Sequence, residues 1–165
     1  MKISINKINI GKNNKTSAVV AMLVIFLVAL GCNSPEKPAA APTESESQTL
    51  VKNTMADFAD AVDKGDFKAF KANTSKEFQA QYTDEQMKTS FKSFTDQKEV
   101  IVPILRDASK MNAKFSTTPA IREEQGYSIL VANGTFDTDP QPLKVVNEYV
   151  YQDGKWKLLK IDVKL

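Results

Sequence analysis

The sequence predicts an α+β domain in which N-terminal helices pack on a curved antiparallel sheet. Three observations support this fold class. Apolar residues recur at helical spacing over residues 49–97, strand-like patterns fill the C-terminal third, and clusters of turn-forming residues divide those strands. A chain of 165 residues has room for one such domain, which we place at residues 49–165, after a signal peptide and a flexible tether.

The chain begins with a segment typical of a bacterial secretion signal. Residues 1–31 hold four lysines and no acidic residue, and residues 18–30 form an uncharged apolar run. At about 1.5 Å per residue, a helix of this run is too short to cross a hydrocarbon core of about 30 Å. We therefore expect residues 1–31 to be a signal peptide that is cleaved.

The only cysteine of the chain follows this run. Ala29-Leu30-Gly31-Cys32 resembles the lipobox of bacterial lipoproteins. The resemblance implies cleavage before Cys32, a diacylglyceryl thioether on its sulfur and acylation of the new N-terminus, which together give a lasting membrane anchor. The alternative is a signal anchor in which Cys32 is incidental. In a Gram-negative source, Asn33 at the next position favours the periplasmic face of the outer membrane.

Residues 32–48 are predicted to be the lipidated cysteine and a disordered tether. Residues 33–48 are rich in proline, alanine, serine and glutamate and contain no large apolar side chain. Such a segment buries too little surface to offset the entropy of ordering.

Helical signals begin at Thr49. An apolar stripe with spacings of three and four residues runs to Gly65, a typical C-terminal cap; it consists of Val51, Met55, Phe58, Ala59 and Val62. Ser75 and the capping box Thr83–Gln86 predict further helix starts, so we expect three helical pieces over residues 49–97. The aromatic residues of this region are expected to belong to the core.

Residues 99–105 are apolar but contain Pro103. Because proline cannot donate to a strand ladder, this run predicts an edge strand or an ordered loop rather than a central strand. Turn signals at 124–126, 137–142 and 152–154 then divide the rest into four strands.

The register of the last hairpin has two candidate solutions. A two-residue turn at Asp153-Gly154 pairs Tyr151 with Trp156, whereas a three-residue loop pairs Val145 with Ile161. We favour the three-residue loop, because it gathers apolar side chains on one face. With the same loop in the hairpin at 124–126, the face toward the helices carries Ile121, Tyr127, Ile129, Val131, Asn133, Leu143, Val145, Asn147, Tyr149, Leu159, Ile161, Val163 and Leu165.

Two stretches carry a resemblance to a known superfamily. Residues 59–67, Ala-Asp-Ala-Val-Asp-Lys-Gly-Asp-Phe, and the Asp153-Gly-Lys-Trp-Lys157 turn and strand are similar to parts of the nuclear transport factor two-like, or cystatin-like, domains. The resemblance covers residues 49–165 and implies a conical α+β domain. Isomerases, dehydratases, transport factors and anchored lipoproteins share this fold, so the fold alone does not assign a function.

Composition argues against several classes of function. Enzymes of the resembled fold use an Asp/His pair, or an Asp base with a Tyr/Asp oxyanion hole. This chain has no histidine, and the predicted inward face has no carboxylate, since Glu148 lies on the opposite phase. We assign no catalytic residue, metal ligand or cofactor. After residue 31 the chain holds 18 basic and 20 acidic residues, which is poor material for nucleic-acid binding.

Four polar residues on the predicted inward face form a candidate ligand site: Tyr127, Asn133, Asn147 and Tyr149. At the mouth of a cone they would orient a small apolar ligand. The alternative is that the amides lie near strand ends and bond to loop backbone or solvent.

An apolar strip on the other face forms a candidate interface: Val146, Val150, Trp156 and Leu158. It suits a protein partner or a homodimer. The alternative is a Trp156 ring shielded by its neighbours.

The sequence thus predicts a lipid-anchored protein of the cell envelope that acts as a non-catalytic binding or interaction module, for a small apolar ligand or an envelope protein. The alternative is a histidine-free enzyme of the same fold, of the isomerase or dehydratase type, using Tyr, Asp or Glu. A carboxylate in a closed pocket would favour the enzyme, and an interior filled by Phe and Leu side chains would favour the interaction module.

Overall fold

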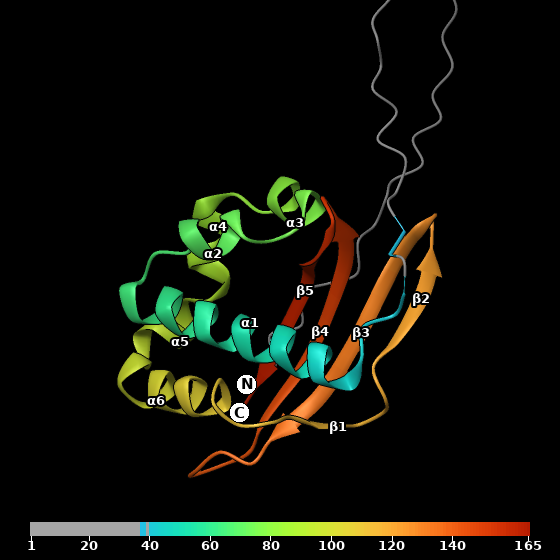
Figure 1. Ribbon diagram of the computed structural model, residues 1–165. Helices are drawn as coiled ribbons and strands as arrows, with labels where there is room; N and C mark the ends of the chain where they lie inside the picture. The colour runs from blue at the N-terminus through green and yellow to red at the C-terminus, as the bar shows by residue number, and fades with distance from the viewer. Residues whose placement is uncertain (1–36, 39) are drawn as a thin grey trace, which may run out of the picture.

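The computed structural model describes residues 37–38 and 40–165. Over these residues, six helices come first and five strands follow in a single antiparallel sheet. The helices lie on one face of that sheet (Figure 1). We call this the inner face and the opposite one the outer face. The predicted α+β class, with helices before an antiparallel sheet, is confirmed.

Helix α1 (Glu44–Lys64) is the longest and begins before the predicted start at Thr49. Thr43 Oγ1 accepts a hydrogen bond from Glu46 N at 3.2 Å, and the Glu46 carboxylate accepts one from Thr43 N at 2.7 Å. This capping box satisfies backbone donors of the first turn and orders a Ser/Glu-rich stretch that composition suggested was disordered. Because α1 includes residues 44–48, the predicted tether boundary at residue 48 is wrong. Gly65 ends the helix with φ +64°, as predicted.

Four short helices follow: α2 (Lys68–Ala72), α3 (Lys76–Gln81), α4 (Asp84–Ser90) and α5 (Lys92–Asp96). The predicted starts are confirmed, since Ser75 Oγ accepts from Phe78 N at 3.1 Å and Thr83 Oγ1 accepts from Gln86 N at 3.2 Å. The prediction of three helical pieces over residues 49–97 is wrong, because α1 and these four short helices make five.

Helix α6 (Lys98–Ala108) replaces the edge strand or loop predicted for residues 99–105. Its buried side chains recur at helical spacing and belong to the same core as those of α1; they are Ile101, Val102, Ile104, Leu105 and Ala108. Burial of a large aliphatic side chain stabilises by about 1.5–3 kcal/mol, so this set outweighs the cost of about 3 kcal/mol for Pro103 inside the helix. Arg106 also joins α6 to α1 through Asp63 and Asp60, at 3.0 and 3.3 Å.

The sheet has the order β1-β3-β4-β5, and β2 also pairs with β3. Its strands are β1 (Lys114–Phe115), β2 (Ala120–Glu124), β3 (Tyr127–Phe136), β4 (Leu143–Gln152) and β5 (Lys155–Lys164). The last four are the strands that the turn signals predict, and the short β1 is an addition.

Both tight hairpins have two-residue turns. Gln125 and Gly126 have φ of 54° and 86°, and Asp153 and Gly154 have 52° and 75°. Positive φ at both central residues matches the twist of the flanking strands, so neither turn needs a third residue. Tyr151 therefore pairs with Trp156, and the favoured three-residue loop is wrong. The same loop in the hairpin at 124–126 is also wrong, because Ile121 pairs with Leu130 rather than Ile129.

A β-bulge in the last hairpin changes which side chains face the helices. Glu148 pairs with Lys160 and Tyr149 pairs with Leu158, so Leu159 has no partner residue on β4. The extra residue reverses the alternation of β5 at this point. Leu158 joins the core under the helices, whereas Leu159 belongs to a cluster with Ile129 and Val150. The bulge therefore places Leu159 on the outer face. The two-residue turn after β2 shifts β3 by one residue, so the other predicted inward positions Tyr127, Ile129, Val131 and Asn133 also lie on the outer face.

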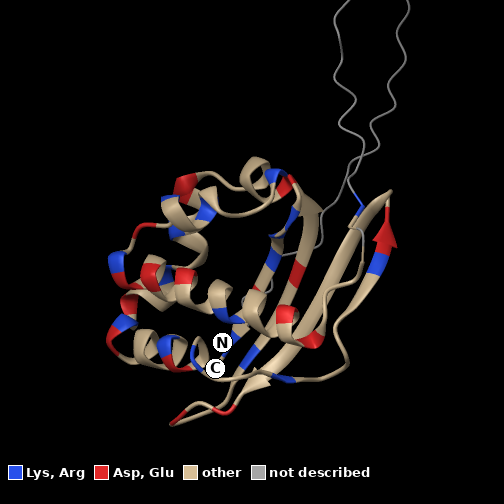
Figure 2. Cartoon of the chain, in the orientation of Figure 1, with Lys and Arg blue, Asp and Glu red and all other residues tan. Residues whose placement is uncertain are grey.

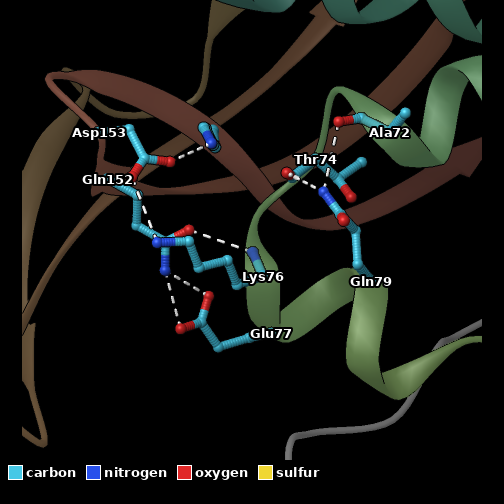
Figure 3. A network of polar contacts seen from close by, with 8 residues as sticks. Ala72, Thr74, Lys76, Glu77, Gln79, Gln152 and Asp153 are labelled. Atoms are coloured by element: carbon cyan, nitrogen blue, oxygen red, sulfur yellow. Dashed lines mark hydrogen bonds and ion pairs between the residues drawn. The ribbon is translucent and has the colours of Figure 1, made fainter. Parts of the chain in front are cut away.

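A polar network attaches α3 to the β4–β5 turn (Figure 3). Gln152 Nε2 donates to both carboxylate oxygens of Glu77, at 2.8 and 2.7 Å, and Gln152 Oε1 accepts from Lys76 N at 3.1 Å. Lys76 Nζ lies 3.2 Å from Asp153. Ser75 N also donates to Leu158 O at 2.9 Å, so the start of α3 covers part of the β5 edge.

Candidate functional site

Several predictions concern residues outside the part of the chain that the structure describes. The signal peptide (1–31), Cys32 and Asn33 are among them. Within the described residues, no helix has the length and apolar character needed to cross a membrane.

The predicted ligand site is split between the two faces of the sheet. Asn147 and Tyr149 lie on the inner face, and both are almost fully buried. Tyr127 and Asn133 lie on the outer face, because β3 is one residue out of the predicted phase. The four residues therefore do not line one cavity, and the predicted grouping is wrong.

Asn147 and Tyr149 form a buried hydrogen-bonded chain with α1. Asn147 Nδ2 donates to Tyr149 Oη at 3.2 Å, and Tyr149 Oη lies 2.9 Å from Thr54 Oγ1. Thr54 Oγ1 donates to the Leu50 carbonyl at 2.9 Å, which uses its only proton. The Tyr149 hydroxyl must therefore donate to Thr54. The amide predicted to bond to a ligand, loop backbone or solvent instead bonds within the core.

Burial raises the pKa of the Tyr149 hydroxyl well above its ordinary value, although its hydrogen bonds to Thr54 and Asn147 oppose that shift. Tyr149 is therefore neutral and acts as a structural donor, not as a base. Asn147 Oδ1 is buried and has no hydrogen-bond partner. The sequence alone does not reveal Thr54 as a partner, because the position of α1 over the sheet is a tertiary feature.

Aromatic side chains of the helical region pack against one another in the core. The Phe58 ring centroid lies 4.9 Å from that of Phe91 and 5.6 Å from those of Phe70 and Phe94. Phe67 stacks on Phe91 at 5.3 Å. Each of these rings is less than a tenth exposed. An interior packed in this way is the arrangement that we associated with an interaction module.

The predicted interface strip is also divided. Trp156 and Leu158 lie on the inner face and pack with the core, and the Trp156 ring meets Tyr151 at 5.4 Å. Val146 and Val150 lie on the outer face, where Val150 packs with Ile129. The two-residue turn and the bulge at Leu159 cause this division. The strip as predicted is wrong, but its two valines remain part of the outer face.

The outer face carries its own apolar cluster, which we call the outer-face cluster. It consists of Ile129, Val150 and Leu159, with Tyr127 and Val131 at its margin. None of the six described helices lies on this side of the sheet (Figure 1). Ile129, Val150 and Leu159 are only 5, 1 and 7 % exposed, whereas Tyr127 and Val131 are half-buried. The margin of the cluster therefore offers accessible apolar surface.

Charged side chains border the outer-face cluster. Glu148 is 14 % exposed and lies 2.9 Å from Arg122 and 3.6 Å from Lys160. Arg122 also pairs with Glu124 at 2.9 Å. The pKa of Arg122 is raised above its ordinary value, mainly because its guanidinium donates a hydrogen bond to Glu148. The position of Glu148 on the outer face agrees with the sequence analysis.

Two acceptor atoms on the outer face have no donor. Val146 pairs with Asn133 on one side and with Asp162 on the other, so these two residues flank it on neighbouring strands. Asn133 Oδ1 and Asp162 Oδ1 are both buried without a hydrogen-bond partner, while the other Asp162 oxygen pairs with Lys164 at 2.9 Å. A buried acceptor without a donor costs roughly 1–3 kcal/mol.

A shallow hollow of about 310 Å³ lies on the helical side. Its lining includes Gly65, Phe67, Lys88 and Lys92. Both lysines already have carboxylate partners, since Lys88 pairs with Glu85 at 3.3 Å and Lys92 with Asp96 at 2.6 Å. The hollow therefore offers weaker recognition chemistry than the outer face.

In the described part of the chain, no three His, Cys, Asp or Glu side chains are grouped to hold a metal ion. Comparisons of the whole chain with protein-family models, curated proteins and solved structures found no match.

Proposed function

We propose that this chain is the precursor of a bacterial lipoprotein that is anchored in the cell envelope through lipid on Cys32. The support is the order of a basic segment, a short apolar run and Ala29-Leu30-Gly31-Cys32, which resembles a lipobox. The ordered domain begins close behind this cysteine, with the capping box at Thr43. In a Gram-negative cell, Asn33 favours the periplasmic face of the outer membrane.

The anchored domain acts as a non-catalytic protein-interaction module, and its helices-then-sheet order is similar to the nuclear transport factor two-like, cystatin-like fold. The observation that carries this proposal is the contrast between the faces. The inner face meets an interior occupied by phenylalanine rings, whereas the outer face carries the outer-face cluster and two acceptors without donors. A protein segment with apolar side chains fits the accessible margin of that face, at Tyr127 and Val131.

Intact mass spectrometry of the membrane fraction tests the anchor. We expect a mature N-terminus at Cys32 that carries the mass of acyl chains, and a Cys32→Ser variant that is neither acylated nor retained in the membrane. An unmodified Cys32 still joined to Gly31 would contradict the proposal.

Complex formation after mild solubilisation of the membranes tests the interaction. We expect the lipidated protein to migrate with a larger partner, and Val131→Arg to migrate as a free monomer, because Val131 is a half-buried member of the outer-face margin. Val100→Arg is the matched control, since Val100 is 61 % exposed on the helical side. Identical migration of all three proteins would contradict the use of the outer face.

A further inference from the structure

We propose that the anchor holds the β2 edge of the sheet toward the membrane, so that the outer face opens sideways along the bilayer. This orientation rests on the lipidation of Cys32 proposed above. Two observations support this orientation. The chain just before α1 lies beside β2 at Lys37, and Lys37 is only five positions from Cys32.

The chain before α1 passes beside the β2–β3 hairpin. Lys37 Nζ lies 3.5 Å from the Glu123 carboxylate on β2. Pro38 and Pro42 are half-buried, and the chain then leads into α1 on the side of the sheet that holds β2 and β3 (Figure 1). The last described residues before the anchor therefore lie beside one edge of the sheet.

Little chain remains between this edge and the lipid. Lys37 follows Cys32 by only five residues. A peptide extends by at most about 3.3–3.6 Å per residue, so the Lys37 backbone lies no more than about 18 Å from Cys32. The composition of residues 33–48 suggested a longer free tether, but the helix start at Glu44 and the contact at Lys37 shorten it. The β2 edge consequently stays near the lipid headgroups.

The opposite end of the domain is much farther from the anchor. Helix α1 has 21 residues, which corresponds to a length of about 31 Å. It runs from the β2–β3 side of the sheet to α5 and α6 (Figure 1). With the β2 edge toward the bilayer, Lys64 at the end of α1 lies up to about 31 Å farther from the bilayer than Glu44 does.

Charge on the β2 edge does not itself attract a membrane. Basic and acidic residues are neighbours along β2 (Figure 2). Arg122 pairs with Glu124 and Glu148, and Lys37 pairs with Glu123. Binding to anionic lipid needs clustered lysines and arginines without such partners. The length of the covalent tether, and not the lipid charge, is therefore expected to set the orientation.

Energy transfer to headgroup-labelled lipid tests the orientation in vesicles that contain the full mature lipoprotein. Cys32 is the only cysteine of the chain, so acylation leaves an introduced cysteine as the only free thiol. Gln125→Cys, in the turn after β2, and Lys64→Cys are labelled with the same donor fluorophore. We expect transfer at position 125 to exceed that at position 64 by at least about twofold, given the length of α1.

Two further arms separate the causes. Ten glycine and serine residues inserted after Pro35 should lower transfer at position 125, and anionic lipid should change neither position. Equal transfer at both positions, higher transfer at 64, or a difference that appears only with anionic lipid would overturn the orientation. Failure of the anchor itself is recognised separately, because an unacylated Cys32 would take up the label in the unsubstituted protein.

Discussion

The buried hydroxyl of Tyr149 provides the sharpest test of how the helices are attached to the sheet. Tyr149→Phe removes the hydrogen bond donated to Thr54 and leaves the Asn147 Nδ2 without an acceptor in the core. A lost buried hydrogen bond costs about 1 kcal/mol and an unpaired amide about 2 kcal/mol, so we expect the free energy of unfolding to fall by about 3 kcal/mol. For a domain of this size the melting temperature should fall by about 10 °C.

Urea denaturation of the purified protein measures this change, with Tyr151→Phe as the matched control. Tyr151 lies on the same strand and face, is half-buried and packs its ring on Trp156. We expect this control to cost less than about 0.5 kcal/mol, as is usual for positions without a buried polar contact. Adding Asn147→Leu to Tyr149→Phe should recover about two thirds of the loss, because it removes the unpaired amide. Equal effects of Tyr149→Phe and Tyr151→Phe would refute the buried hydrogen-bonded chain.

Three further predictions concern stability. Thr43→Ala removes the capping box of α1 and should cost about 1 kcal/mol in the free energy of unfolding, whereas an unchanged value would show that the cap does not stabilise α1. Phe58→Ala should cost about 3–5 kcal/mol, because its ring contacts four other phenylalanines, and Val100→Ala, at a site 61 % exposed, should be nearly neutral. Because burial raises the pKa of Tyr149 in the folded state, its contribution is fully present below pH 10 and declines above it, as the unfolded chain ionises. Urea midpoints between pH 9 and 12 should therefore fall less steeply in Tyr149→Phe than in the unsubstituted protein, and equal slopes would contradict this assignment.

Local signals predicted several helix ends and the positions, although not the lengths, of the two tight turns. Gly65, Ser75 and Thr83 each occupy the capping position that the sequence indicates. Each of these signals acts through hydrogen bonds within a few residues, so it is legible without tertiary structure. The fold class follows from the same signals, because they separate a helical half from a strand-rich half.

The errors arose where tertiary packing decides. Pro103 argues against a helix locally, but the apolar stripe of α6 packs in one core with α1 and outweighs that preference. In the last hairpin, both candidate registers place apolar residues on one face. Near the turn, even-numbered residues of β5 such as Leu158 face the helices, and beyond the bulge at Leu159 odd-numbered residues such as Ile161 do. A single-residue shift moves every side chain of a strand to the opposite face, so the site residues could not be grouped correctly.

The outer face was partly visible in the sequence. The phase of Glu148 and the positions of Val146 and Val150 were predicted for the face away from the helices, and the structure confirms these placements. The acceptors of Asn133 and Asp162 were not recognised, because their lack of donors depends on which strands flank Val146.

Site-specific photocrosslinking in intact membranes tests the central claim most directly. A photoreactive side chain is placed at Val131, on the margin of the outer-face cluster, or at Val100, which is 61 % exposed on α6. An outer-face interaction module should give a discrete crosslinked protein from position 131 and none from position 100. Crosslinks from position 100 alone, or from neither position while Cys32 is acylated, would contradict the account.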